Sequence, residues 1–299
     1  MPDGLLARIL SAYGVPHVHI AAPQKGYRNA SYAVDATYNL ILYKSEPGIL
    51  ARIKNANAVG AAAAKAGLPA RAPQRHRIIK LSSGNRVKYA ALYNYLPGHT
   101  IPWEAYTMDH IKALGQAMGN MHHALATYSA NDLPDVADES TELLKRMRRY
   151  FADENVAKAL KNKLGISGFT CDFANILTTS KKLPGQQALH MDFVRGNILF
   201  DDTTITGILD FEKTAKGSPL FDVARTLAFL LVDCKYKSES KIRKYFLQSG
   251  YIKRGCHPLK DYKINSCSIL ESLVDFFLLH DFYKFLRHNP YEYLPQNEH

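Results

Sequence analysis

The 299-residue chain is poor in cysteine, and its few thiols form no close pair. Cys171, Cys234, Cys256 and Cys267 are separated by 63, 22 and 11 residues, so no Cys-x-x-Cys unit occurs. Zinc sites and the disulfide frameworks of small secreted domains need paired thiols at characteristic spacings. We therefore expect free thiols in a reducing compartment, and neither a zinc site nor a disulfide scaffold.

Long apolar runs are also missing. Residues 1–14 lack the basic start followed by a long apolar core that marks a secretory signal. The longest apolar run, residues 227–232, is far too short to cross a bilayer. We expect a cytoplasmic protein with no membrane partner. With 46% hydrophobic residues, the chain can bury a sizeable core as one large domain or two lobes.

Acidic residues are scarce in the first third of the chain. Residues 1–100 contain 13 Lys or Arg against three acids, whereas residues 101–200 have 11 of each and residues 201–299 have 14 against 13. The net charge of +11 therefore resides almost entirely in the first third. A basic segment attracts nucleotide phosphates, nucleic acids or anionic surfaces. The basic residues are scattered and no RNA- or DNA-binding motif accompanies them, so we expect no nucleic-acid partner.

Strand patterns dominate before residue 94 and helix patterns after residue 98. Strands are expected over residues 18–21, 31–34, 38–43, 77–81 and 86–93. A short helix is expected over residues 5–13 and the main helix of this region over residues 49–66. Further helices are expected over residues 108–127, 139–159, 173–181, 218–232, 239–248 and 266–287. Between the two regions, Pro97 and Gly98 break the pattern. This predicts an α+β fold with an N-terminal lobe (1–93), a hinge (94–98) and a mostly helical C-terminal lobe (99–299).

The most informative stretch, residues 190–212, contains His190, Asp192, Asn197 and Asp210. Residues 198–200 and 205–209 read as two strands of a hairpin around a turn at 201–204. The hairpin would bring Asn197 and Asp210 to one metal although they are 13 residues apart. Each residue alone has an ordinary interpretation as a turn, cap or packed residue. Together they indicate phosphoryl transfer, in which Asp192 accepts the proton of a hydroxyl and Asn197 and Asp210 bind Mg²⁺.

The same residues resemble a known family. His-x-Asp, four residues, Asn, and then Leu-Asp-Phe is similar to the catalytic core of the aminoglycoside phosphotransferase and choline kinase superfamily. Asp222, within GSPLFDVART, matches an aspartate that braces the catalytic loop there. The resemblance covers most of the chain. It implies a two-lobed, protein-kinase-like fold with an N-terminal antiparallel sheet, ATP and Mg²⁺ as cofactors, and a small-molecule hydroxyl as the acceptor.

The resemblance extends to the nucleotide half. GYRNASYAV is similar to the family's Gly-x-x-Asn-x-x-Tyr-x-Val loop, which assigns Gly26 and Asn29 to nucleotide binding. The family's hinge pairs with the base through backbone groups, here those of Asn94 and Leu96. A plain turn and a plain interlobe linker are the alternatives.

The third strand departs from the family pattern. The position that usually carries a phosphate-binding basic residue is Ile41, so Lys44 becomes the candidate, with an exposed strand-end lysine as the alternative. The glutamate that would pair with such a lysine from the next helix is missing. Asn55 and Asn57 lie near its expected place, and either could hydrogen-bond the lysine.

Three further assignments concern the reacting groups. We expect His190 to pack within the catalytic loop rather than act as a base, and Arg195 either to offset γ-phosphate charge or to lie on the surface. Glu271 and Asp275 lie one helical turn apart among aromatic residues, which would suit an amine-binding pocket. The alternative is an amphipathic helix whose aromatic side chains pack in the core.

The sequence thus favours an ATP-dependent phosphotransferase of a small-molecule hydroxyl, similar to aminoglycoside phosphotransferases. A homoserine-kinase-like or choline-kinase-like metabolic enzyme is the nearest alternative. A nucleotide-binding pseudokinase with a regulatory role is the alternative from another class, because Ile41 is atypical. The acceptor, the choice between ATP and GTP, and the oligomeric state stay open.

Overall fold

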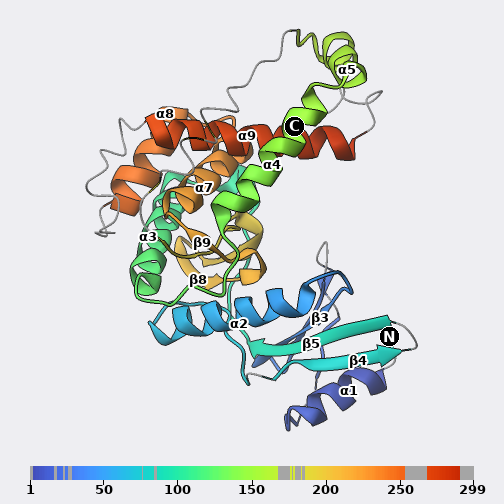
Figure 1. Ribbon diagram of the computed structural model, residues 1–299. Helices are drawn as coiled ribbons and strands as arrows, with labels where there is room; N and C mark the ends of the chain where they lie inside the picture. Colours follow the sequence, from blue (N-terminus) through green and yellow to red (C-terminus); the bar gives the residue numbers. More distant parts are fainter. Residues whose placement is uncertain are drawn as a thin grey trace. The chain divides into compact units, whose positions relative to one another are not determined.

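A computed structural model divides the chain into two compact units (Figure 1). It describes residues 3–16, 19–22, 24–25, 29–75, 77–83, 86–167, 176, 178, 183, 186–252 and 268–289. The N-terminal unit contains Met1–Ile101 and Arg195–Thr214, and the helical unit contains Pro102–Val194 and Ala215–His299. The division differs from the boundaries expected from the order of the elements, because residues 195–214 pack with the N-terminal residues.

The N-terminal unit is built on a five-stranded antiparallel sheet, as the predicted fold class requires. Its strand order is β1-β2-β3-β5-β4. The strands are β1 (Gln24–Lys25), β2 (Ala30–Val34), β3 (Tyr38–Tyr43), β4 (Ile79–Ser83) and β5 (Arg86–Asn94). Of the strand expected over residues 18–21, the described part forms only an isolated bridge between Ile20 and Val34. The strand β1 instead lies where a turn was expected.

Alternating side chains give this sheet two apolar faces. Leu40, Leu42 and Leu92 pack in a cluster with the helix α1 (Asp3–Ala12). Their neighbours Ile41 and Tyr43 face the other way, into a cluster with α2 (Ile49–Lys65). Because side chains alternate along a strand, the sheet is covered by α1 on one face and α2 on the other, as Figure 1 shows.

The predicted hairpin is confirmed. Strands β7 (Ile198–Asp201) and β8 (Thr204–Ile208) pair antiparallel. Asp201 pairs with Thr204, so the turn is shorter than expected. The hairpin belongs to the N-terminal unit because Ile208 forms a parallel bridge with Ala70 and Phe200 an antiparallel bridge with His99. These bridges explain why residues 195–214 group with a sheet formed about a hundred residues earlier.

The helical unit contains seven described helices and a two-stranded sheet. The helices are α3 (Met108–Leu125), α4 (Val136–Phe151), α5 (Glu154–Leu164), α7 (Leu220–Asp233), α8 (Glu239–Arg243), the π-helix η4 (Lys244–Tyr251) and α9 (Ser268–His288). The sheet pairs β6 (Gln187–Leu189) with β9 (Ala215–Gly217). Short 3-10 turns are η1 (Trp103–Ala105) in this unit and η2 (Arg195–Asn197) and η3 (Phe211–Lys213) in the N-terminal unit.

The helix expected over residues 139–159 is two helices. Asp153 interrupts it, and its Oδ1 accepts the backbone N–H groups of Asn155 and Val156 at the start of α5. Most of the helix expected over 173–181 lies outside the described residues. Along the described chain, no helix is both long and apolar enough to cross a membrane.

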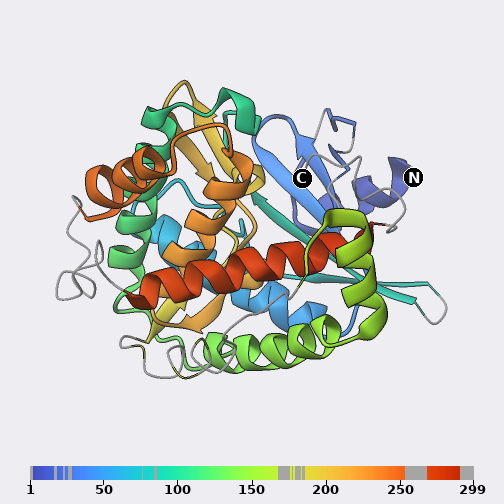
Figure 2. The same cartoon turned by 90° about the horizontal axis from the view of Figure 1, so that it is seen from above.

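Two close helix contacts organise the core of the helical unit. A Cβ atom on Gly115 of α3 would lie 2.1 Å from the carbonyl oxygen of Phe246 in η4, so only glycine permits this approach. The helices α7 and α9 lie side by side in Figures 1 and 2, and the guanidinium of Arg225 on α7 lies over the Phe277 ring of α9.

Gly60 in α2 provides a test of packing in the N-terminal unit. A Cβ atom there would lie 2.3 Å from the carbonyl oxygen of Arg71. We predict that Gly60→Ala lowers the free energy of unfolding by about 1–3 kcal/mol, although alanine is the better helix former by about 1 kcal/mol. Gly4→Ala, where no atom lies within 4 Å, is the control and should leave stability unchanged or slightly higher. Urea denaturation measures both, and a Gly60→Ala variant as stable as the wild type would contradict the packing.

Candidate active site

The base of the β7–β8 hairpin brings together the two residues predicted to bind metal. Asn197 ends η2 immediately before β7, and its carbonyl oxygen accepts the backbone N–H of Leu209 at 2.8 Å. Asp210 follows Leu209 in a left-handed conformation with φ of 53°, and its Oδ1 accepts the backbone N–H of Glu212. The hydrogen bond therefore closes the hairpin with Asn197 and Asp210 at the same end.

This pair fits the donor set of a magnesium site. Mg²⁺ is usually held by one or two protein oxygens together with substrate phosphates, rather than by an all-protein cage. Asp210 offers a carboxylate and Asn197 an amide oxygen. Within the described ranges, no group of three or more His, Cys, Asp or Glu side chains is placed to hold a metal.

A pocket lies beside Asp210 on the α2 face of the sheet. Its walls include Ile41, Tyr43, Tyr93 and Arg71. The two tyrosine hydroxyls are 2.6 Å apart, and that of Tyr93 donates to Asn57 Oδ1 at 2.7 Å. Burial raises the pKa of both tyrosines, so the hydroxyls stay protonated at neutral pH. The amide oxygen of Asn57, predicted as a partner for a lysine, instead accepts from Tyr93.

The predicted nucleotide-loop residues are only partly described. Gly26 lies outside the described residues. The Asn29 side chain donates to Glu212 Oε1 at 2.7 Å and accepts the backbone N–H of Lys44 at 3.2 Å. Asn29 thereby joins the end of β3 to the segment that follows Asp210. Lys44 is exposed directly after β3. Their predicted contacts with a nucleotide stay predictions.

In the predicted hinge, fewer backbone groups are free to contact a nucleotide base than the sequence suggests. Asn94 ends β5, and its backbone N–H donates to the Ala72 carbonyl at 3.1 Å. Its side chain accepts the Ala72 N–H at 2.7 Å and donates to the Ala70 carbonyl. Asn94 therefore fixes the segment after α2, and its N–H is already used. The predicted hydrogen bonds to the nucleotide base are therefore left to the Asn94 carbonyl and to the backbone of Leu96, which is half-buried. They stay a prediction.

In the helical unit, Asp222 organises the loop that carries Asp192. Its Oδ2 accepts the backbone N–H of His190 at 2.8 Å, and its Oδ1 accepts that of Met191 at 2.6 Å. Met191 has a φ of 57°, which is strained for a residue with a side chain. His190 is fully buried, and its Nδ1 accepts the Asp192 N–H at 3.1 Å, so the ring proton resides on Nε2. This geometry suits a loop-building role for His190.

The Asp222 carboxylate also accepts a hydrogen bond from the ring of a second histidine, His122. Nε2 of His122, on α3, lies 3.1 Å from Oδ2, and Nδ1 of the same ring lies 2.8 Å from the Tyr251 hydroxyl. Burial raises the pKa of Asp222, but the hydrogen bonds from the His122 ring and the His190 backbone help to outweigh burial, and the pKa is lowered overall. A buried, ionised carboxylate thus holds the loop that carries Asp192 against α3 and η4.

Arg225 on α7 is the direct partner of the predicted base. Its guanidinium lies 3.3 Å from Asp192 Oδ1. The same group lies over the rings of Phe229 and Phe277, at 5.6 and 5.8 Å from their centroids. Its Nε is buried and has no acceptor among the described residues. Arg225 therefore orients Asp192 from a largely aromatic surrounding.

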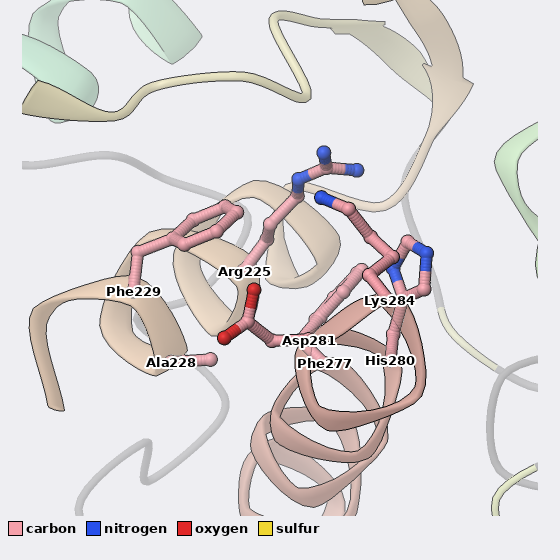
Figure 3. A pocket seen from close by; sticks show the side chains of 7 residues that line it. All are labelled: Arg225, Ala228, Phe229, Phe277, His280, Asp281 and Lys284. Carbon is pink, nitrogen blue, oxygen red and sulfur yellow. The ribbon is translucent and has the colours of Figure 1, made fainter. Parts of the chain in front are cut away.

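A pocket opens next to Arg225 between α7 and α9 (Figure 3). Arg225, Ala228 and Phe229 come from α7, and Phe277, His280, Asp281 and Lys284 come from α9. The charged groups have both signs, so this wall alone does not select a cationic ligand.

The proposed amine-binding pair lies elsewhere on α9. Glu271 is exposed and forms an ion pair with Arg243 at 2.9 Å, and Asp275 is exposed. The neighbouring Phe276 and Phe277 are buried. Glu271 and Asp275 thus lie on the exposed face of α9, and their role in an amine-binding pocket stays a prediction. Arg195 is also exposed, in η2.

Comparison with known proteins decides the family. The model of the APH family, described as phosphotransferase enzymes, matches residues 19–234 and so more than half of the chain. The chain belongs to this phosphotransferase enzyme family. The resemblance inferred from residues 190–222 is thereby confirmed. No curated protein matches the chain by sequence.

Solved structures show the fold of these phosphotransferases. The GDP and kanamycin complex of APH(2")-IIIa is 16% identical with a TM-score of 0.63, covering 98% of this chain and 95% of that one. Amicoumacin kinase hAmiN, in complex with AMP-PNP, Ca²⁺ and Ami, is 12% identical with a TM-score of 0.67, covering 99% and 94%. A thermostable mutant of APH(4)-Ia with ADP and hygromycin B is 15% identical with a TM-score of 0.61, covering 94% and 90%. The chain therefore has the kinase-like fold of the family.

Several residues of this phosphotransferase site escaped the sequence reasoning. Arg225 is the one basic residue in the apolar segment Leu220–Asp233, and this isolation was a usable signal. His122 and Tyr251 gave no such signal, because their roles depend on the meeting of α3, η4 and α7 around Asp222.

The Asp222 network predicts a specific stability change. Asp222→Asn removes a buried carboxylate that accepts N–H groups from three residues, so we expect a loss of about 3–5 kcal/mol at pH 7. Asp153→Asn is the matched control, because asparagine caps a helix as well as aspartate does, and it should change stability by less than about 0.5 kcal/mol. Urea denaturation gives both values.

The pH dependence of the same difference has a defined sign. The folded-state pKa of Asp222 lies below its ordinary value of 3.8, so its carboxylate stabilises the fold above that value. The stabilisation is lost as pH falls through the folded-state pKa. The difference in unfolding free energy between wild type and Asp222→Asn should therefore be constant above about pH 5 and shrink below about pH 4. A difference that grew with acidity would contradict the assignment.

Proposed function

We propose that this phosphotransferase transfers the γ-phosphoryl group of ATP to a hydroxyl of a small molecule. The observation that carries the proposal is the hydrogen bond from Leu209 N–H to the Asn197 carbonyl, which closes the hairpin with Asn197 and Asp210 together. Asp192 precedes this pair on a buried loop braced by Asp222. A base and two hard oxygen ligands are the protein groups that metal-assisted phosphoryl transfer requires.

Each residue has a distinct role in this proposal. Asp192 orients the acceptor hydroxyl and takes its proton, while Arg225 holds the carboxylate in place. Asn197 and Asp210 hold Mg²⁺, whose charge, when bound, offsets that of the nucleotide phosphates. His190 supports the loop through its ring, and exposed Arg195 supplies positive charge for the γ-phosphate.

The ligands of the similar solved structures suggest candidates for the acceptor and the nucleotide. Their structures contain kanamycin, hygromycin B or Ami as small-molecule ligands and GDP, ADP or AMP-PNP as nucleotides. We therefore include aminoglycosides and both ATP and GTP among the candidates for this chain. Homoserine and choline represent the metabolic alternative. We place the reaction in the cytoplasm, where ATP is abundant and a free thiol such as Cys234 stays reduced.

A nucleotide-binding pseudokinase is the second candidate, favoured by one observation. Ile41, at the third-strand position where the resemblance implies a basic residue, is buried in the apolar cluster against α2. The presence of Asp192, Asn197 and Asp210 argues for catalysis, because these three residues carry the chemistry and the metal.

Turnover tests the assignment of Asp192. With MgATP or MgGTP, we expect phosphorylation of at least one member of a panel of aminoglycosides, macrolides, homoserine, choline and sugars. Asp192→Asn should lower kcat about 10²- to 10⁴-fold and leave the nucleotide Kd within about twofold. Asp201→Asn, at the exposed end of β7, is the control and should retain full kcat. Nucleotide binding without turnover on any acceptor would favour the pseudokinase, and full kcat in Asp192→Asn would remove Asp192 as the base.

Metal dependence tests Asp210. Because Asp210 offers the carboxylate of the proposed site, Asp210→Asn should raise the Mg²⁺ concentration for half-maximal activity by about 10-fold or more. Asp202→Asn in the hairpin turn is the control, since asparagine tolerates its φ of 49°. Steady-state rates measured over a Mg²⁺ titration provide the comparison. An unchanged Mg²⁺ requirement in Asp210→Asn would exclude Asp210 as a metal ligand.

A further inference from the structure

The pocket beside Asp210 contains a cation that the sequence reasoning did not consider. Ile41, Tyr43 and Tyr93 come from the sheet, and Asp210 and Glu212 follow the hairpin. Arg71 follows α2 and is the one basic side chain among the described residues that line the pocket. All of these residues belong to the N-terminal unit.

The backbone at Arg71 is held from several sides. Its N–H donates to the Ile208 carbonyl of the hairpin at 2.9 Å. On either side, Ala70 and Ala72 are both hydrogen-bonded by the Asn94 side chain. The absence of a side chain on Gly60 lets α2 approach the Arg71 carbonyl closely. This segment is therefore fixed by β5, β8 and α2 at once, which positions the arginine beside the residues that follow β8.

The surroundings of the Arg71 guanidinium leave its positive charge available to bind an anion. It is half-buried and lies over the Tyr93 ring, 6.0 Å from the centroid. Its positive charge favours the ionised forms of the Tyr43 and Tyr93 hydroxyls, although burial dominates their pKa. Among the described residues, none forms an ion pair with Arg71. The nearby Glu212 is instead hydrogen-bonded by Asn29.

Lys44, the sequence candidate for phosphate binding, has a different setting. Continued by one residue, the alternation of β3 puts Lys44 on the face of Leu40 and Leu42, which packs against α1. The pocket with Asp210 lies on the opposite face, with Ile41 and Tyr43. Lys44 is also exposed, where a charge is screened by water and salt.

We propose that Arg71 binds the phosphates of the nucleotide, in the role that the third-strand residue Ile41 cannot fill. The inference rests on the proposed function, because it concerns the nucleotide of that reaction. A planar guanidinium can bind two phosphate oxygens at once, and partial burial strengthens the interaction. The carboxylates of Asp210 and Glu212 repel phosphates, so a pocket that accepts a polyphosphate needs such a cation together with the metal.

Nucleotide affinity distinguishes phosphate binding from mere packing. MgATP, MgGTP, adenosine and guanosine are titrated calorimetrically into the full chain. We expect Arg71→Met to weaken binding of the preferred triphosphate about 10- to 100-fold, the range for loss of a charge-assisted hydrogen bond. The affinity for the matching nucleoside should stay within about twofold. Arg71→Lys should recover part of the triphosphate affinity, and Lys44→Met should lower it much less than Arg71→Met does.

The outcomes separate this inference from the proposed function. If the wild type binds none of the four probes, the proposed function fails and the role of Arg71 fails with it. If the wild type binds but Arg71→Met weakens nucleoside and triphosphate equally, Arg71 acts through packing and the inference is overturned. Loss of triphosphate affinity in Lys44→Met but not in Arg71→Met also overturns it.

Folding of the variants is checked by thermal unfolding. Should Arg71→Met fail to fold, Arg71→Lys carries the test, because it keeps the charge and loses the planar pair of donors. It should then bind the triphosphate more weakly than the wild type while the nucleoside affinity holds. Equal triphosphate affinity in Arg71→Lys and wild type, together with unchanged affinity in Lys44→Met, would overturn the assignment of a bidentate contact.

Discussion

The hydrogen bonds that the buried Asp222 carboxylate accepts are the interactions on which the proposed catalytic loop depends. The carboxylate accepts the backbone N–H groups of His190 and Met191 and the ring of His122, so buried donors that water cannot reach are satisfied. It also compensates the strained backbone of Met191. These hydrogen bonds also position Asp192. Arg225, which lies on α7 like Asp222, forms an ion pair with the Asp192 carboxylate. Helix α7 thus supplies both the brace of the loop and the partner of the proposed base.

A comparable constraint acts in the N-terminal unit. The β7–β8 hairpin is closed by Leu209 and Asn197 and attached to the preceding chain through the bridge between Ile208 and Ala70. The same attachment holds Arg71 next to the residues that follow β8. The proposed oxygen ligands of the metal and the proposed cation for the phosphates therefore depend on one set of backbone hydrogen bonds. Substitutions that disturb these backbone hydrogen bonds should weaken the binding of metal and of nucleotide together. Substitutions of the Asp210 or Arg71 side chain should affect the two separately.

Local features of the site could be predicted from the sequence, because their geometry depends on neighbours along the chain. The hairpin, its closure on Asn197 and Asp210, and the family of the chain followed from residues 190–222, and the α+β class followed from strands before residue 94 and helices after residue 98. The setting of Arg71 and the pairing of Arg225 with Asp192 could not be predicted in this way, since the partners lie far away in sequence. The exposure of Glu271 could not be predicted for the same reason: helical spacing gives a shared face, but only packing decides which face is buried.

A structure of the chain with Mn²⁺ and AMP-PNP would examine the proposed reaction centre itself, with Mn²⁺ located by its anomalous scattering. We predict one Mn²⁺ bound by Asp210 Oδ and Asn197 Oδ1 at about 2.0–2.3 Å and by phosphate oxygens of the nucleotide. The pair closed by Leu209 would then be the metal site of this phosphotransferase. Nucleotide bound with its metal remote from both Asn197 and Asp210 would contradict this account of residues 190–212.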